Sequence, residues 1–203
     1  MQYQQPNKPV LSVFDFDGTL TYRDSFTLFL RREFGIRTYA IGLLRMALPS
    51  LKFLLGISSR DELKQRLINT FLCGISADSL AQLAEDFCEK SWPTLMRSKA
   101  CAGVSEQVNA GATVTLCSAS PEIILRPFAR RLGVELIATR LEVSNGILTG
   151  LIDGQNCRQS EKVSRLISAY GDLKSFHIRA WGDSAGDKQL LEAADEPYYR
   201  WFH

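Results

Sequence analysis

A short apolar run that ends in two carboxylates constrains the fold more than any other feature of the chain. Residues 10–16 are rich in Val, Leu and Phe, which is typical of a buried strand, and Asp15 and Asp17 stand at its end. Two like charges this close repel each other, and a buried carboxylate is unfavourable unless something positive pairs with it. Either the two carboxylates lie in water on a turn, or the fold brings a positive group between them.

The pattern after Gly111 predicts a parallel sheet. Alternating segments indicate strands over 112–120, 134–139, 176–183 and 197–202, helices over 121–133, 160–171 and near 187–194, and a hairpin over 140–152. We expect Ser120 to cap the first of these helices, with Pro121 in its first turn. Strands that alternate with helices favour a parallel sheet covered on both faces, so the predicted fold class is α/β with a Rossmann-like core.

A helical segment separates the first strand from the others. Between Ser25 and Lys99 the apolar residues recur at helical spacing, and no strong strand pattern is present. We therefore predict a core built from residues 8–24 and 100–203, with residues 25–99 inserted after the first strand as a small helical cap.

Residues 36–57 are the most apolar part of this cap. Arg45 and Lys52 interrupt the segment, Pro49 lies near its middle, and its longest uncharged run falls short of the roughly 18 residues expected of a spanning helix. We expect a buried cap helix. The alternative is a helix at a membrane surface whose cations reach the headgroups.

Composition excludes several classes of protein. The formal net charge of +2 and the lack of aromatic residues among the arginines argue against a nucleic-acid partner. Five cysteines without a Cys-x-x-Cys motif fit buried thiols in a reducing compartment, and two histidines are too few for a histidine-rich metal site. Together with a polar N-terminal stretch, this predicts a cytoplasmic protein.

Polar residues with a possible role in chemistry end three predicted strands. Asp15 and Asp17 end the first, Ser118 and Ala119 the second, and Asp183 a later one, while Asp187 follows shortly after. The carboxyl ends of parallel strands meet at one edge of a sheet, so we expect these residues to lie together. Taken singly, each has an ordinary alternative as a turn or capping residue.

Lys162 is harder to explain as an ordinary surface residue. It stands in the first turn of a predicted helix, where a cation opposes the helix dipole. The segments DFDGTLT, LCSAS and GDSAGD, together with this lysine, resemble the haloacid dehalogenase-like hydrolases, the superfamily of phosphatases with an aspartate nucleophile. The helical insert resembles the subgroup that contains phosphoserine phosphatases. However, Ala119 and Ser120 stand where those enzymes usually carry glycines, which argues against phosphoserine as the substrate.

The resemblance implies hydrolysis of a phosphomonoester with Mg²⁺ as the cofactor. Asp15 would attack phosphorus and form an aspartyl-phosphate, and Asp17 would act as acid and then base. Ser118, the backbone at Ala119, and Lys162 would hold the phosphoryl oxygens.

The expected metal ligands are Asp15, the backbone carbonyl of Asp17, and Asp183, with Asp187 slightly further out. Asp24 and Arg60 are the candidates for substrate selection in the cap, and the expected substrate is a small phosphorylated metabolite. Two alternatives stay open: a lipid-phosphate phosphatase of the phosphatidylglycerophosphate type at the membrane surface, and a non-catalytic regulatory protein that binds phosphate.

Overall fold

Five parallel strands form the centre of the molecule. The computed structural model describes residues 8–56 and 59–203, without the side chains at positions 48, 49, 52 and 53. The strands lie in the order β3-β2-β1-β6-β7, and every neighbouring pair is parallel. Their bounds are β1 Val10–Phe14, β2 Thr113–Pro121, β3 Glu135–Thr139, β6 His177–Gly182 and β7 Glu196–Tyr199.

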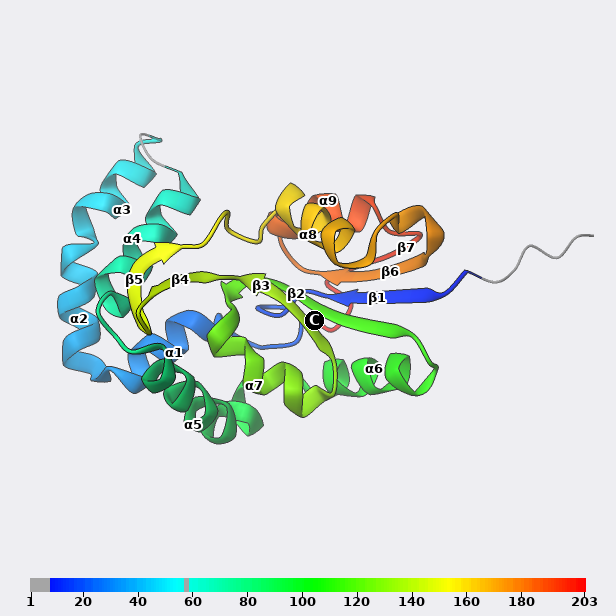
Figure 1. Ribbon diagram of the computed structural model, residues 1–203, viewed down its shortest axis with the longest axis horizontal. Helices are drawn as coiled ribbons and strands as arrows, with labels where there is room; N and C mark the ends of the chain where they lie inside the picture. The colour runs from blue at the N-terminus through cyan, green and yellow to red at the C-terminus, as the bar shows by residue number, and fades with distance from the viewer. Residues whose placement is uncertain (1–7, 57–58) are drawn as a thin grey trace, which may run out of the picture.

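Helices cover both faces of this sheet (Figure 1). On one face lie α6 (Ser98–Asn109) and α7 (Glu122–Leu132), and on the other lie α8 (Ser160–Tyr170) and α9 (Lys188–Glu192). Short 3₁₀ turns at Leu173–Ser175 and Ala185–Asp187 complete this part of the chain. The prediction of an α/β fold with a parallel, Rossmann-like sheet is confirmed.

The central strand β1 is buried on both faces, which explains its continuous apolar sequence. Leu11 and Val13 face the core under α8 and α9, while Phe14 belongs to the core on the other side. The Phe14 ring stacks on Trp181 of β6 with centroids 4.1 Å apart. This packing fixes the strand end from which Asp15 and Asp17 follow.

One detail at the end of β2 differs from the prediction. Ser120 does not cap the following helix, because β2 continues through Pro121 and that residue holds the N-cap position of α7. The Ser120 hydroxyl instead donates a hydrogen bond to Asp17 across the sheet edge. Sequence alone cannot separate these two uses of a serine before a helix.

The region between β1 and α6 is helical, as expected. It contains α1 Ser25–Glu33, α2 Gly35–Arg45, α3 Ala47–Leu54, α4 Arg60–Leu72 and α5 Ala77–Leu95. The hairpin of β4 (Leu141–Ser144) and β5 (Ile147–Ile152) joins this layer, since Leu148 exchanges backbone hydrogen bonds with Gly74 and Ile75 just beyond α4. The division into a core and a cap at residues 25–99 stays a prediction.

The expectation of a buried helix over residues 36–57 is wrong. The segment forms two helices joined at Met46, and its apolar side chains include the exposed Ile36, Leu44 and Leu54. Among the described side chains of this segment, Gly42 and Met46 are buried and Tyr39 and Ser50 are half-buried. Residue 57 and the side chains of Leu48, Pro49 and Lys52, which entered that expectation, lie outside the described residues.

Gly42 is the point at which α2 approaches α4. A Cβ atom there would lie 2.1 Å from the ring of Phe71, so a larger side chain requires either the Phe71 ring or the helices themselves to move. We predict that Gly42→Leu lowers the stability by about 1–3 kcal/mol, even though leucine favours helices more than glycine does. Thermal unfolding measures the change. Ala40→Leu, on the exposed side of the same helix, is the matched control and should leave the melting temperature nearly unchanged.

Candidate active site

A cavity of about 560 Å³ opens at the carboxyl edge of the sheet, and the predicted site residues line it. The ends of β1, β2 and β6 form the floor of the cavity. The start of α1 and the start of α4 form the wall opposite this floor. The predicted residues that it brings together are Asp15, Asp17, Asp24, Arg60, Ser118, Ala119, Lys162, Asp183 and Asp187.

Asp15 is held by a lysine and a threonine. Its Oδ1 accepts a hydrogen bond from Lys162 Nζ at 2.6 Å, and its Oδ2 accepts one from Thr19 Oγ1 at 3.1 Å. The residue is 6% exposed. Burial raises the pKa of Asp15 to about 8, and the Lys162 charge opposes this shift. The positive group that the paired carboxylates required is therefore Lys162.

Lys162 also contacts a second buried carboxylate. Its Nζ lies 2.6 Å from Asp187 Oδ1 as well as from Asp15 Oδ1, and the lysine is 1% exposed. Burial alone would lower the pKa of Lys162, but the two carboxylates hold it well above its ordinary value. The lysine therefore stays charged, with two of its three donors used inside the protein.

The start of α8 is strained where it positions this lysine. Gln159, at the N-cap, has φ 55° and ψ −127°, a backbone region that residues other than glycine rarely occupy. Its N–H donates to the Gly186 carbonyl at 2.8 Å, which ties the helix to the loop that carries Asp183 and Asp187. The strain thus lies three residues before the lysine that pairs with Asp15.

Asp187 and Asp183 differ in how their carboxylates are used. Asp187 Oδ1 binds Lys162, while its Oδ2 accepts from the Ser184 hydroxyl at 2.8 Å and from backbone N–H groups. Burial acts to raise the pKa of Asp187, but the charge of Lys162 outweighs this effect and lowers the pKa. Asp183 is half-buried, and burial together with the Asp187 charge raises its pKa. Within the described part of the chain, no hydrogen bond reaches its carboxylate.

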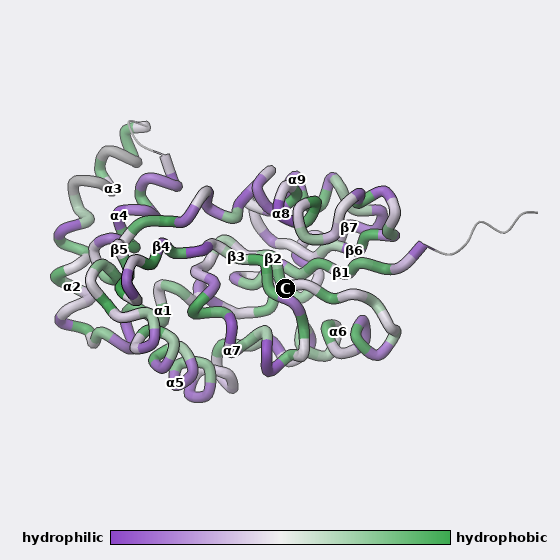
Figure 2. The backbone as a smooth tube through the Cα atoms, in the orientation of Figure 1, coloured by the Kyte–Doolittle hydropathy of each residue, from purple (hydrophilic) through white to green (hydrophobic). Residues whose placement is uncertain are grey.

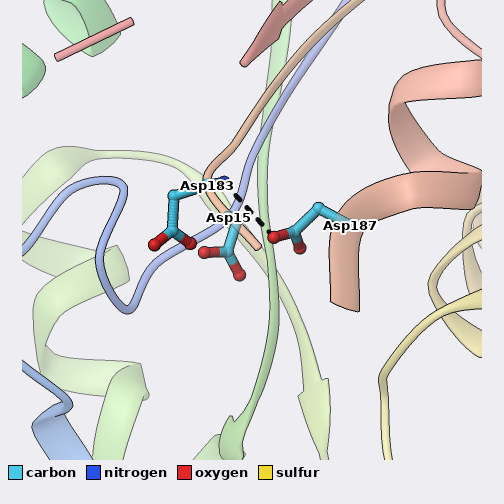
Figure 3. A group of neighbouring side chains, drawn as sticks. All are labelled: Asp15, Asp183 and Asp187. Carbon is cyan, nitrogen blue, oxygen red and sulfur yellow. Dashed lines mark hydrogen bonds between the residues drawn. The ribbon is translucent and has the colours of Figure 1, made fainter. Parts of the chain in front are cut away.

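These three aspartates form a cluster that suits a divalent cation. One carboxylate oxygen from each of Asp15, Asp183 and Asp187 lies within 4.8 Å of the others (Figure 3). Gly18 makes room for the group, since a Cβ there would lie 2.3 Å from Asp183 Oδ2. An unpartnered carboxylate beside two others, with oxygen as the donor atom throughout, matches the chemistry of a site for Mg²⁺. The Asp17 carboxylate is not part of this cluster.

Asp17 points to a different set of partners. Its Oδ1 accepts from the Ser25 N–H at 2.6 Å, and its Oδ2 accepts from the Ser120 hydroxyl at 2.5 Å. Burial and the nearby Asp24 charge raise the pKa of Asp17 to about 6, against the effect of these hydrogen bonds. Two carboxylates that are separated by a single residue in the sequence therefore have different environments.

The end of β2 brings the predicted phosphate-binding residues to the cavity. Ser118 is 1% exposed, and its hydroxyl accepts a hydrogen bond from the Ser120 N–H at 3.1 Å. The Ala119 carbonyl accepts from Lys64 Nζ of α4. Lys64 Nζ also donates to Asn156 Oδ1 at 2.7 Å, and burial lowers the pKa of Lys64 to about 8.

The two cap residues predicted to select the substrate line the outer part of the cavity. Asp24 caps α1, where its Oδ1 accepts from the Thr27 N–H at 2.7 Å. Arg60 is the first residue of α4, and Ser59 caps that helix. Both side chains are exposed. A role in substrate selection stays a prediction for each.

Four polar residues contact the site although the sequence did not predict a role for them there. They are Thr19, Ser120, Lys64 and Asn156, which hold Asp15, Asp17 and the Ala119 carbonyl. Thr19 and Ser120 stand within the two recognised segments, so a signal for them was present. Lys64 and Asn156 are 92 positions apart and carry no motif, so only the folded chain brings them together.

Comparisons with known proteins show the family to which the chain is related. A family model described as haloacid dehalogenase-like hydrolase matches residues 12–192. Protein CicA of Caulobacter vibrioides is 40% identical over all of this chain and 90% of its own length. A crystal structure of a protein of unknown function from Bordetella pertussis Tohama I has a TM-score of 0.80 at 28% identity, covering 92% of this chain and 87% of the other.

A phosphoserine phosphatase is similar in fold. Its structure as a phospho-aspartyl intermediate analogue has a TM-score of 0.59 at 22% identity, covering 93% of this chain and 84% of the other. At this identity the likeness shows the fold alone.

The contacts of Lys162 predict a large effect on stability. Lys162→Met leaves the buried Asp187 and Asp15 without their shared cation, so we expect a loss of about 3–5 kcal/mol in a buffer that contains a chelator. Chemical denaturation of the purified variant measures this loss. Lys188→Met is the matched control, because Lys188 is exposed and, among the residues the structure describes, its one ion pair is with Glu192 at 3.7 Å; its effect should stay below about 1 kcal/mol. Equal stability of the two variants would contradict the assigned role of Lys162.

Proposed function

The chain belongs to the haloacid dehalogenase-like hydrolase family, and from this premise we propose that it hydrolyses phosphate monoesters through an aspartyl-phosphate on Asp15. One observation carries the proposal. Asp15 and Asp17 face the same cavity, but Asp15 is paired with Lys162 while Asp17 is held by Ser25 and Ser120. The two carboxylates therefore have different partners, which suits them to different steps of the reaction.

Asp15 suits the role of nucleophile, because Lys162 and a bound Mg²⁺ would keep its carboxylate ionised against the effect of burial on its pKa. Its carboxylate oxygen would attack phosphorus, the bond to the leaving oxygen would break, and an acyl phosphate would form on Asp15. Lys162 is positioned to offset the negative charge of both the carboxylate and the arriving phosphoryl group. The N–H groups beyond Ser118, at the end of β2, are the candidates to hold the phosphoryl oxygens.

Asp17 suits the role of acid and base. Its pKa of about 6 leaves a fraction of the carboxyl groups protonated near neutral pH, so that it can give a proton to the leaving alkoxide. In the second half-reaction it would take a proton from the water that attacks phosphorus, which releases phosphate and restores Asp15. Hydrogen bonds from Ser25 and Ser120 keep its carboxylate in place between the two steps.

Mg²⁺ is the proposed cofactor. Asp15, Asp183 and the backbone carbonyl of Asp17 would hold it, while Asp187, which binds Lys162 and the Ser184 hydroxyl, would act from slightly further out. When bound, the ion would neutralise the clustered carboxylates and polarise a phosphoryl oxygen.

The lining of the cavity supports a small polar substrate. Arg60 and Asp24 offer a guanidinium and a carboxylate on the cap side, and Arg158 lies on the core side. Such a lining would suit a phosphorylated metabolite that carries further charged groups, which an arginine can bind in bidentate fashion.

The metal requirement is directly testable. Hydrolysis of an aryl phosphate should cease with a chelator and return with Mg²⁺. Gly18→Ala should weaken Mg²⁺ binding by at least about tenfold in calorimetric titration, because the new methyl group would occupy the position of Asp183 Oδ2 and φ is +81° at this residue. Gly74→Ala is the control, since Gly74 has φ +83° and open space around it. Full activity in the chelator would refute the proposed cofactor.

Substitution of the two carboxylates tests the division of labour. Asp15→Asn should abolish turnover, while Asp17→Asn should slow both the release of the leaving group and the breakdown of the phosphoenzyme by roughly 10²–10⁴-fold. Rapid-quench measurement of labelled phosphoenzyme separates these steps. Label on a serine, or turnover by Asp15→Asn at the wild-type rate, would contradict the mechanism. Asp172→Asn, at a turn outside the cavity lining, is the control.

A further inference from the structure

An unusually large apolar surface lies on α2 and α3. Among the described side chains of α2, α3 and the residue that follows α3, seven large apolar ones are exposed, between 44% for Leu43 and 78% for Leu54. The others are Ile36, Ile41, Leu44, Leu51 and Leu55. Burial of these side chains would be favourable, and a group of this size on one segment indicates an interaction site.

The exposed residues form a regular stripe. Four exposed apolar positions of α2 are each followed, eleven positions later, by another exposed apolar residue. The Met46 backbone between α2 and α3 is itself helical, so at about 100° per residue each pair lies on nearly the same side. The pairs are Ile36 and Ala47, Ala40 and Leu51, Leu43 and Leu54, and Leu44 and Leu55, and all eight are exposed. We call these eight residues the apolar stripe.

The rest of the fold leaves the stripe uncovered. Tyr39, Gly42 and Met46 face α4, so the helices contact the protein along a different line of residues. In Figure 1, α2 and α3 lie at the outer edge of the helical region, with α4 and β5 on their inner side. Figure 2 shows the mixed hydropathy of these two helices.

The charge of this segment has one sign. Between Glu33 and Asp61 the sequence contains arginines and a lysine but no carboxylate. Arg37 and Arg45 are exposed, and at about 100° per residue both lie on the Ile41 side of the stripe. An apolar helix surface with cations along one edge is the pattern of a helix that lies in a membrane interface, where arginine reaches the headgroups.

We infer that the apolar stripe docks the protein on the surface of a bilayer that contains anionic lipid. The charge complementarity decides between this partner and a second copy of the chain. Two copies joined through the stripe would bring the cations of both together, and the segment offers no carboxylate to pair with them.

Docking requires no helix that crosses the bilayer. In the described part of the chain, every helix is too short or too polar to span one. The inference concerns where the protein lies and is independent of the proposed hydrolysis, so either can fail without the other.

Sedimentation with vesicles tests the inference. The full chain, in chelator and at low salt, should sediment with phosphatidylglycerol–phosphatidylcholine vesicles, at least about tenfold more strongly than with phosphatidylcholine alone, and added salt should release it. Neither lipid carries a phosphomonoester, so the result does not depend on turnover. No sedimentation with the anionic vesicles would overturn the inference.

Variants locate the contact. Leu44→Glu and Leu54→Glu should each weaken vesicle binding by at least about tenfold, because a charge would enter the apolar boundary. Ile167→Glu is the matched control; Ile167 is 50% exposed but lies on α8, and this change should have no effect. An equal loss for Ile167→Glu would overturn the inference.

A pair of polar substitutions provides a test that leaves the apolar side chains intact. Arg37→Gln combined with Arg45→Gln removes two exposed cations and should weaken binding to anionic vesicles by about thirtyfold, with the melting temperature unchanged. Unchanged binding would overturn the inference. Analytical ultracentrifugation tests whether a second copy of the chain binds the stripe instead. A dimer that Leu44→Glu dissociates would assign the stripe to a second copy and overturn the membrane contact.

Discussion

The buried contact between Lys162 and two aspartates organises the functional part of the molecule. A carboxylate at the end of β1 is tolerable inside the protein because Lys162 Nζ lies 2.6 Å from it, and the lysine is tolerable because Asp187 lies equally close on its other side. The contact joins β1, α8 and the loop after β6, which lie far apart in the sequence. The position and the charge of Asp15 at the sheet edge therefore depend on three segments that must fold together.

The same contact explains why the two neighbouring aspartates do not share one environment. Lys162 and Thr19 occupy both oxygens of Asp15, and the backbone then turns so that Asp17 reaches Ser25 and Ser120 instead. Their separation keeps one carboxylate beside a cation and leaves the other among neutral donors. In the proposed mechanism this difference, rather than the identity of the side chains, assigns nucleophile and acid.

Much of the fold and the centre of the site could be predicted from the sequence, because they depend on local signals. Strand and helix patterns predict the parallel sheet, and strand ends predict that Asp15, Ser118 and Asp183 meet at one edge. Two features could not be predicted. The contact of Lys64 with Asn156 depends on how α4 lies over the sheet, and the exposure of residues such as Leu44 depends on which side of an apolar helix the fold covers. Helical periodicity reveals an apolar side but not its partner.

Residues 36–57 illustrate this limit of helical periodicity. A helix can be apolar on a side that its own protein does not cover: in α2, Tyr39, Gly42 and Met46 face the rest of the chain while Leu44 is exposed. The fold therefore does not require the residues of the stripe to be apolar. Their apolar character instead reflects what the stripe contacts outside the molecule. Two helices contact both parts: α1 packs against α2, α4 packs against α2 and α3, and both helices line the cavity. The surface that we assign to the membrane and the site that we assign to catalysis are therefore built on separate residues, and α1 and α4 connect them.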